Sequence, residues 1–117
     1  MARILVVDDE PDIRFLLRLI FEGAGHIVAE ARDGAAGGAS VKIARPDLII
    51  TDMMMPMMGG QEFITGLRSH PETATIPILA VSGNPELASA ADAVLSKPFL
   101  PKELLIMAAQ LIGKNGR

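Results

Sequence analysis

Four charged residues of this 117-residue chain stand where apolar runs end. Asp8 and Asp9 close the run ILVV, and Asp52 closes the run LIIT. Lys97 comes two residues after the run AVL. Such runs are typical of strands buried in a parallel sheet, and the carboxyl ends of those strands meet at one edge. The four side chains are therefore predicted to converge on a single pocket.

The three carboxylates in this pocket favour a divalent cation. Close together, they repel one another by several kcal/mol at an effective dielectric of about 20, so they must take up protons or recruit a positive ion. The chain has no cysteine, and neither of its two histidines lies at a predicted strand end near the pocket. A small set of oxygen ligands favours Mg²⁺, for which Mn²⁺ can substitute. We therefore expect Asp8, Asp9 and Asp52 to hold Mg²⁺.

Lys97 and Ser82 suggest an anion site beside that cation. Lys97 supplies a compact positive charge, and Ser82 supplies a hydroxyl at the end of the run ILAV. A phosphoryl group held there would lie in line with Asp52, whose carboxylate would act as nucleophile and become an acyl phosphate. Ser82 has an alternative reading as a cap of the turn that follows it, without any catalytic role.

The elements that must position these residues alternate along the chain. Strands are predicted at residues 4–7, 26–29, 48–51, 78–81 and 93–95, and helices at 11–23, 34–44, 60–69, 85–91 and 101–112. Pro11 and Pro101 suit helix starts, Asp33 suits an N-cap, and Gly113 suits a helix end. Alternation with short loops implies right-handed crossovers. The predicted fold is α/β, a doubly wound five-stranded parallel sheet in a three-layer sandwich.

Composition limits the remaining possibilities. A chain of 117 residues, 50% hydrophobic, fits one domain over 1–117, and we expect no output domain within it. A net charge of −3 provides no basic field, so we expect no direct contact with nucleic acid or an anionic membrane. No apolar run approaches the roughly 18 residues of a membrane span, and we expect no leader before the first strand. We therefore expect a cytoplasmic protein.

The ordered set of strings VVDD, ITDMMMP, Gly59-Gly60, VSG and LSKPF resembles the receiver domain of two-component response regulators over nearly the whole chain. The resemblance implies a flavodoxin-like sheet with strand order 2-1-3-4-5. It implies that Asp52 accepts phosphate from a histidine kinase or a histidine phosphotransfer protein. The signal would then pass to a downstream protein target in a two-component system or a phosphorelay.

The resemblance also implies individual roles. Asp9 would bind Mg²⁺ directly, Asp8 would help through water, and the backbone carbonyl of Met54 would be a further ligand beside Asp52. Lys97 would contact the phosphoryl group, and Ser82 would turn toward it as the switch hydroxyl. The peptide bond between Lys97 and the next proline would be cis.

Two features depart from the usual receiver pattern. Lys97 follows Ser82 by 15 residues, whereas the family has about two more helical turns there, so the fourth helix is expected to be short or missing. Val94 stands where the family often carries a switch Tyr or Phe, and the chain contains no Tyr or Trp. We therefore expect phosphorylation to be retained and its readout to differ, through ordering of residues 83–91.

Several alternatives compete with this interpretation. A phosphohydrolase similar to haloacid dehalogenases would need a second acid two residues after Asp52, where Met54 stands. A nucleotide-binding module would need a glycine-rich string after the first strand, where Asp8 and Asp9 would repel phosphate. A degenerate receiver that binds partners without phosphorylation stays open. Beyond its own phosphotransfer and autodephosphorylation, the chain is not expected to be an enzyme.

Residues 53–58 include five methionines. They are read as filling for a loop and the core, with a methionine-lined binding surface as the alternative.

Overall fold

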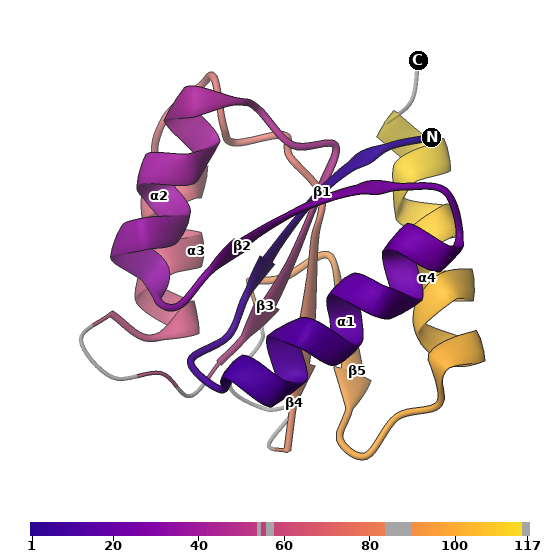
Figure 1. The fold of residues 1–117 in the computed structure, drawn as a ribbon. Coiled ribbons are helices and arrows are strands. Elements are labelled where there is room, and N and C mark those ends of the chain that lie inside the picture. The colour runs from indigo at the N-terminus through magenta and orange to yellow at the C-terminus, as the bar shows by residue number, and fades with distance from the viewer. Residues whose placement is uncertain (54, 56–57, 84–89, 116–117) are drawn as a thin grey trace.

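A five-stranded parallel sheet in the order β2-β1-β3-β4-β5 forms the middle layer of the computed structural model (Figure 1). The structure describes residues 1–53, 55, 58–83 and 90–115, with side chains as far as residue 113. The elements are β1 (Arg3–Val7), α1 (Pro11–Gly23), β2 (Ile27–Ala31), α2 (Gly34–Ile43), β3 (Leu48–Asp52), α3 (Gly60–Arg68), β4 (Ile78–Ser82), β5 (Ala93–Ser96) and α4 (Pro101–Asn115). The predicted fold class and strand order are confirmed.

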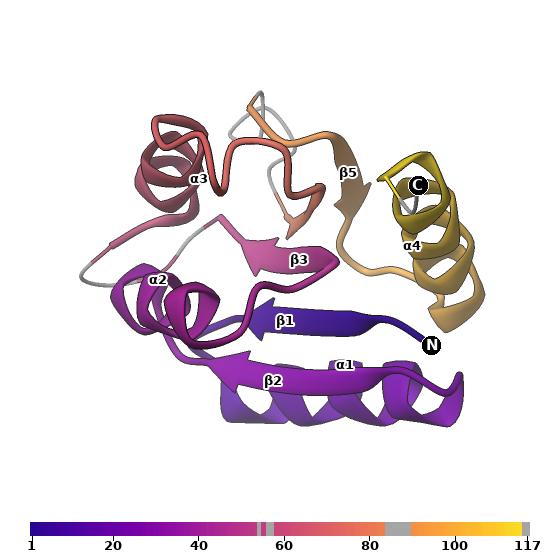
Figure 2. The ribbon, with the colours of Figure 1, turned by 90° about the horizontal axis from the view of Figure 1, so that it is seen from above.

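Helices cover both faces of the sheet, with α1 and α4 on one side and α2 and α3 on the other (Figures 1 and 2). Alternate residues of β1 supply the two cores, because successive side chains of a strand point to opposite faces. Ile4 and Val6 pack in the cluster that includes Leu17 of α1, and Leu5 packs in the cluster that includes Phe63 of α3. Burial on both faces explains why these strands are continuous apolar runs.

The glycine-rich helix α2 is held at its start by Asp33. The Asp33 side chain accepts a hydrogen bond from the Ala36 N–H at 2.8 Å, which satisfies one of the free donors of the first turn. The predicted N-cap is therefore present.

Some predicted boundaries are wrong by one to three residues. The second strand was expected at 26–29 but runs over Ile27–Ala31, because its pairing with β1 continues from Arg3↔Ile27 to Val7↔Ala31. Glycine closes a helix mainly where the backbone turns left-handed, as it does at Gly25, where φ is 92°. Gly113 instead continues the last helix, which ends at Asn115 rather than at residue 112.

The expected helix at 85–91 falls largely on residues 84–89, which lie outside the described part of the chain. Residues 90–92 form a turn that leads into β5, and the described residues contain four helices. None of the helices in the described ranges is long and apolar enough to cross a membrane.

Candidate functional site

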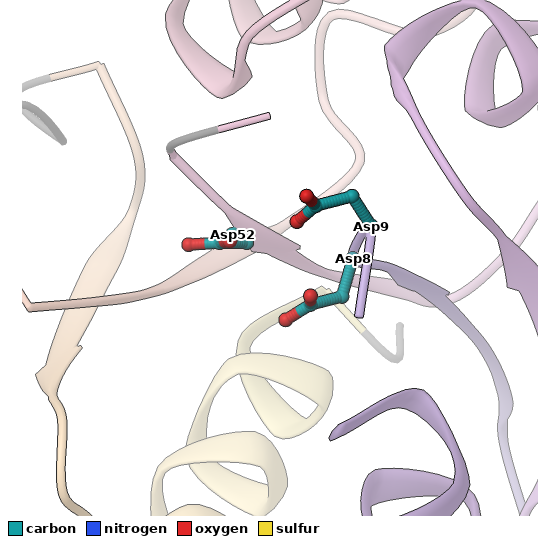
Figure 3. Close-up of side chains that lie close together, drawn as sticks. All are labelled: Asp8, Asp9 and Asp52. Carbon is teal, nitrogen blue, oxygen red and sulfur yellow. The ribbon is translucent and has the colours of Figure 1, made fainter. Parts of the chain in front are cut away.

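The acidic cluster lies at the carboxyl ends of β1 and β3. These strands are neighbours in register, with Val7 opposite Thr51, so Asp8 and Asp9 emerge beside Asp52. One carboxylate oxygen from each of the three acids lies within 4.8 Å of the other two. Figure 3 shows the three side chains directed toward the same space. The structure thus brings together the three acids that the sequence singled out.

Asp8 lies in an environment that opposes its charge. Its exposed fraction is 2%. Burial raises the pKa of Asp8 to about 6, a hydrogen bond from the Glu10 N–H opposes that rise, and the charge of Asp52 adds to it. The Glu10 N–H donates to Asp8 Oδ1 at 2.9 Å. Positive charge in the pocket would therefore stabilise the ionised cluster.

Lys97 brings positive charge to this cluster from the residue after β5. Its Nζ lies 3.6 Å from Asp52 Oδ1 and 3.8 Å from Asp8 Oδ2. The Lys97 backbone N–H donates to the Ser82 carbonyl at 3.0 Å, which holds the lysine against the end of β4. The Lys97-Pro98 peptide bond is cis, as the resemblance implied. The ammonium group thus lies close to both carboxylates.

Ser82 is the last residue of β4, the strand between the one that ends at Asp52 and the one that precedes Lys97. It is fully buried, and its register partner on β5 is Ser96. The sheet therefore places Ser82 in the same row of strand ends as the charged residues.

Gly60 lets α3 begin directly against the end of β3. A Cβ added at Gly60 would lie 2.5 Å from the Asp52 carbonyl oxygen, closer than real Cβ contacts. The Gly60 N–H donates to the Met53 carbonyl at 3.1 Å, and the Met53 N–H donates to Asp52 Oδ1 at 2.8 Å. These two bonds fix the backbone that follows Asp52.

Residues 4–109 match the family described as response regulator receiver domain. The chain belongs to this family. The receiver is 36% identical over 124 residues to the DNA-binding dual master transcriptional regulator RpaA of Synechocystis, an alignment that covers 100% of this chain and 52% of RpaA. It thus spans about half the length of the curated relatives that it matches first.

Solved structures support the same assignment. The receiver superposes on the chemotaxis response regulator CheY4 of Vibrio cholerae with a TM-score of 0.88 and 35% identity, covering 95% of this chain and 98% of CheY4. It superposes on the response regulator TrrA of Thermotoga maritima, in complex with Mg²⁺ and BeF, with a TM-score of 0.86 and 30% identity. That alignment covers 95% of this chain and 99% of TrrA.

Two further expectations concern the residue at position 94 and the backbone carbonyl of Met54. Val94 lies in β5, half-buried, and packs against the core on the α3 side of the sheet. The carbonyl of Met54 belongs to a residue outside the described part of the chain. Met53, Met55 and Met58 all pack in or against the same core cluster, which agrees with the reading of these three as core filling.

Sequence reasoning missed Arg14. Its Nη1 donates to the Asp8 carbonyl at 2.6 Å, and its Nε lies 3.2 Å from Glu30 Oε1 on β2. The partner of this guanidinium is a backbone carbonyl, which every residue has, so no residue type in the sequence marks the contact. The available signal was its place in the first turn of a helix that starts beside the acidic pair.

Proposed function

We propose that this receiver accepts a phosphoryl group on Asp52 from a histidine kinase or a histidine phosphotransfer protein, and so changes its contacts with a downstream protein. The observation that carries the proposal is the Lys97 ammonium 3.6 Å from Asp52 Oδ1, within a cluster of three acids. A carboxylate flanked by a fixed cation and by cation ligands suits phosphoryl transfer, which depends on positioning and charge neutralisation.

In the proposed reaction an Asp52 oxygen attacks the phosphorus atom. The bond from phosphorus to the donor's histidine nitrogen breaks as the new bond to Asp52 forms, and the imidazole leaves with the electron pair. The product is an acyl phosphate on Asp52. Lys97 would bind the oxygens of the transferred group, and Ser82 would turn its hydroxyl toward them.

The donor set fits a divalent ion. Three carboxylate oxygens within 4.8 Å of one another, without nitrogen or sulfur ligands, suit Mg²⁺, with Mn²⁺ as a substitute. Asp8, Asp9 and Asp52 would hold the ion, together with the Met54 carbonyl outside the described residues. When bound, the ion would neutralise charge on the carboxylates and the phosphoryl oxygens.

The surface beside the pocket supports a protein as the donor. Helix α1 begins two residues after Asp9 and exposes three large apolar side chains, Phe15, Leu16 and Leu19. Exposed apolar groups of this size suit a protein contact. Receiver domains are signalling domains rather than enzymes, and we infer that this one catalyses only its own phosphotransfer and autodephosphorylation.

A degenerate receiver that binds partners without phosphorylation is the second candidate. The short stretch from Ser82 to Lys97 and the valine at position 94 favour it. The complete set of three acids and a lysine, assembled in one pocket, favours phosphorylation.

Intact mass after incubation with acetyl phosphate separates the two candidates. We expect the native chain to gain the mass of one phosphoryl group with Mg²⁺ and to gain nothing with a chelator. Asp52→Asn should stay unmodified, whereas Asp12→Asn, which changes an exposed acid of α1, should behave as the native chain does. A native chain that gains no mass under any condition would contradict the proposal and favour the degenerate receiver.

A further inference from the structure

Arg14 forms a bridge between the loop that carries Asp8 and Asp9 and the edge strand β2. Its Nη1 donates to the Asp8 carbonyl at 2.6 Å, and its Nε lies 3.2 Å from Glu30 Oε1. The Arg14 side chain is 18% exposed, so the bridge is partly shielded from water. Partial burial acts to raise the pKa of Glu30, but hydrogen bonds from Arg18 and Arg14 hold that pKa below its usual value. Glu30 therefore stays ionised and anchors Arg14.

The carbonyl that Arg14 binds belongs to the peptide group that joins Asp8 to Asp9. Fixing this peptide fixes the directions in which both neighbouring side chains leave the backbone. The rest of the loop has other restraints, since the Asp8 N–H donates to the Ala31 carbonyl at 3.1 Å and the Glu10 N–H donates to the Asp8 carboxylate. Arg14 therefore restrains the peptide group that sets the orientation of the Asp8 and Asp9 side chains.

We propose that Arg14 is a positioning residue for the cation site, which it shapes by clamping the Asp8–Asp9 peptide against Glu30. The inference rests on the proposed function, because it concerns the Mg²⁺ ligands. Residues that orient metal ligands without touching the metal commonly change metal affinity by 10- to 100-fold when they are replaced.

Charge and position predict opposite effects of removing Arg14. As a positive charge near the site, Arg14 repels a cation, so its loss would tighten Mg²⁺ binding if electrostatics alone counted. As a clamp, it keeps Asp8 and Asp9 aimed at one point, so its loss would weaken binding. The direction of the change therefore distinguishes the two roles.

The test is a Mg²⁺ titration of the whole chain at fixed pH and ionic strength, followed by amide chemical shifts, with thermal unfolding measured in parallel. Arg14→Met keeps an aliphatic side chain of similar length and removes the guanidinium group. Arg18→Met is the matched control, because Arg18 binds Glu30, Glu22 and the Val28 carbonyl one turn further along the same helix. We expect Arg14→Met to bind Mg²⁺ about tenfold more weakly than the native chain, and Arg18→Met to bind within about twofold of it.

Unchanged or tighter binding by Arg14→Met would overturn the inference, and so would equal weakening by both variants. Should Arg14→Met fail to fold, Glu30→Ala removes the acceptor at one end of the bridge and should weaken binding by about threefold. Native affinity in that variant would also overturn the inference. A native chain that binds no Mg²⁺ would overturn the metal site of the proposed function itself, and this inference with it.

Discussion

The buried carboxyl of Asp8 ties the stability of the metal-free protein to pH. Its pKa rises from 3.8 to about 6, chiefly because burial disfavours the charge. A raised pKa means that the fold favours the protonated acid. The contribution of Asp8 to the free energy of unfolding is therefore complete below about pH 4 and is lost as the pH rises through 6. The loss amounts to about 3 kcal/mol at most.

We expect Asp8→Asn to remove this pH dependence of stability when both proteins are kept metal-free by a chelator. The native free energy of unfolding, measured by urea denaturation from pH 4 to pH 8, should fall relative to that of the variant as the pH rises. An asparagine oxygen can still accept the Glu10 N–H, so the local turn is retained. Parallel pH profiles for the two proteins would contradict the prediction. Saturating Mg²⁺ should restore native stability at pH 7.5, because the ion stabilises the ionised form.

At the residue scale, the sequence was most informative where side chains themselves carry the chemistry. Asp8, Asp52 and Lys97 could be identified because each stands at the end of an apolar run, and the sheet does place those ends together. Arg14 could not be identified, and Gly60 was noted only as part of a family string without its steric role, because both act at backbone carbonyls. Contacts of that kind depend on the path of the chain, which residue types do not record.

At the element scale, the start of α3 depends on the absence of a side chain at Gly60. Gly60→Ala would place a methyl group 2.5 Å from the Asp52 carbonyl oxygen. This clash can be relieved only if β3 or α3 moves. Overpacking of this kind costs about 1–3 kcal/mol, more than the gain of up to about 1 kcal/mol that alanine brings to a helix. We expect lower thermal stability and slower phosphorylation of Asp52 by acetyl phosphate.

Gly66→Ala in the same helix is the control for this prediction. No heavy atom lies within 4 Å of a Cβ added at Gly66, so the variant should be more stable by about 0.5–1 kcal/mol and should react at the native rate. If both alanines shift the melting temperature in the same direction, the steric reading of Gly60 is wrong.

Element types were easier to predict than element ends. The strands stand out because both faces are buried, so their apolar runs are continuous. The end of β2 was missed because Glu30 and Ala31 do not extend an apolar run, yet the ladder with β1 continues to Ala31. Gly113 misled for a related reason, since glycine permits a helix end without requiring one.

At the scale of the whole molecule, a prediction concerns how the proposed phosphorylation would change the structure. The family's usual aromatic switch is absent at Val94, and the β4–β5 connection is short. We expect hydrogen exchange of backbone amides in residues 83–91 to slow when a phosphoryl mimic, beryllofluoride, is added with Mg²⁺. Asp52→Asn provides the control. Exchange in this segment that does not respond to the mimic would contradict the expectation.

The order of the strands in the sheet came from the resemblance to receivers, whereas alternation of strands and helices predicted only the layers. Periodicity and turn residues act within one element or between neighbours along the chain. The placing of β1 between β2 and β3 depends on competition among all possible pairings of the sheet. A single sequence read by its local patterns does not resolve that competition.

The place of Lys97 after β5, the last strand along the chain, has a consequence for synthesis on the ribosome. All three acids of the cluster precede Lys97, the lysine that approaches two of them, and are therefore translated before it. A nascent chain therefore gathers its negative charges before its compensating positive charge has been made. During that interval Lys97 cannot neutralise the cluster, so we expect dissolved cations to favour the pairing of β1 with β3 in the nascent chain.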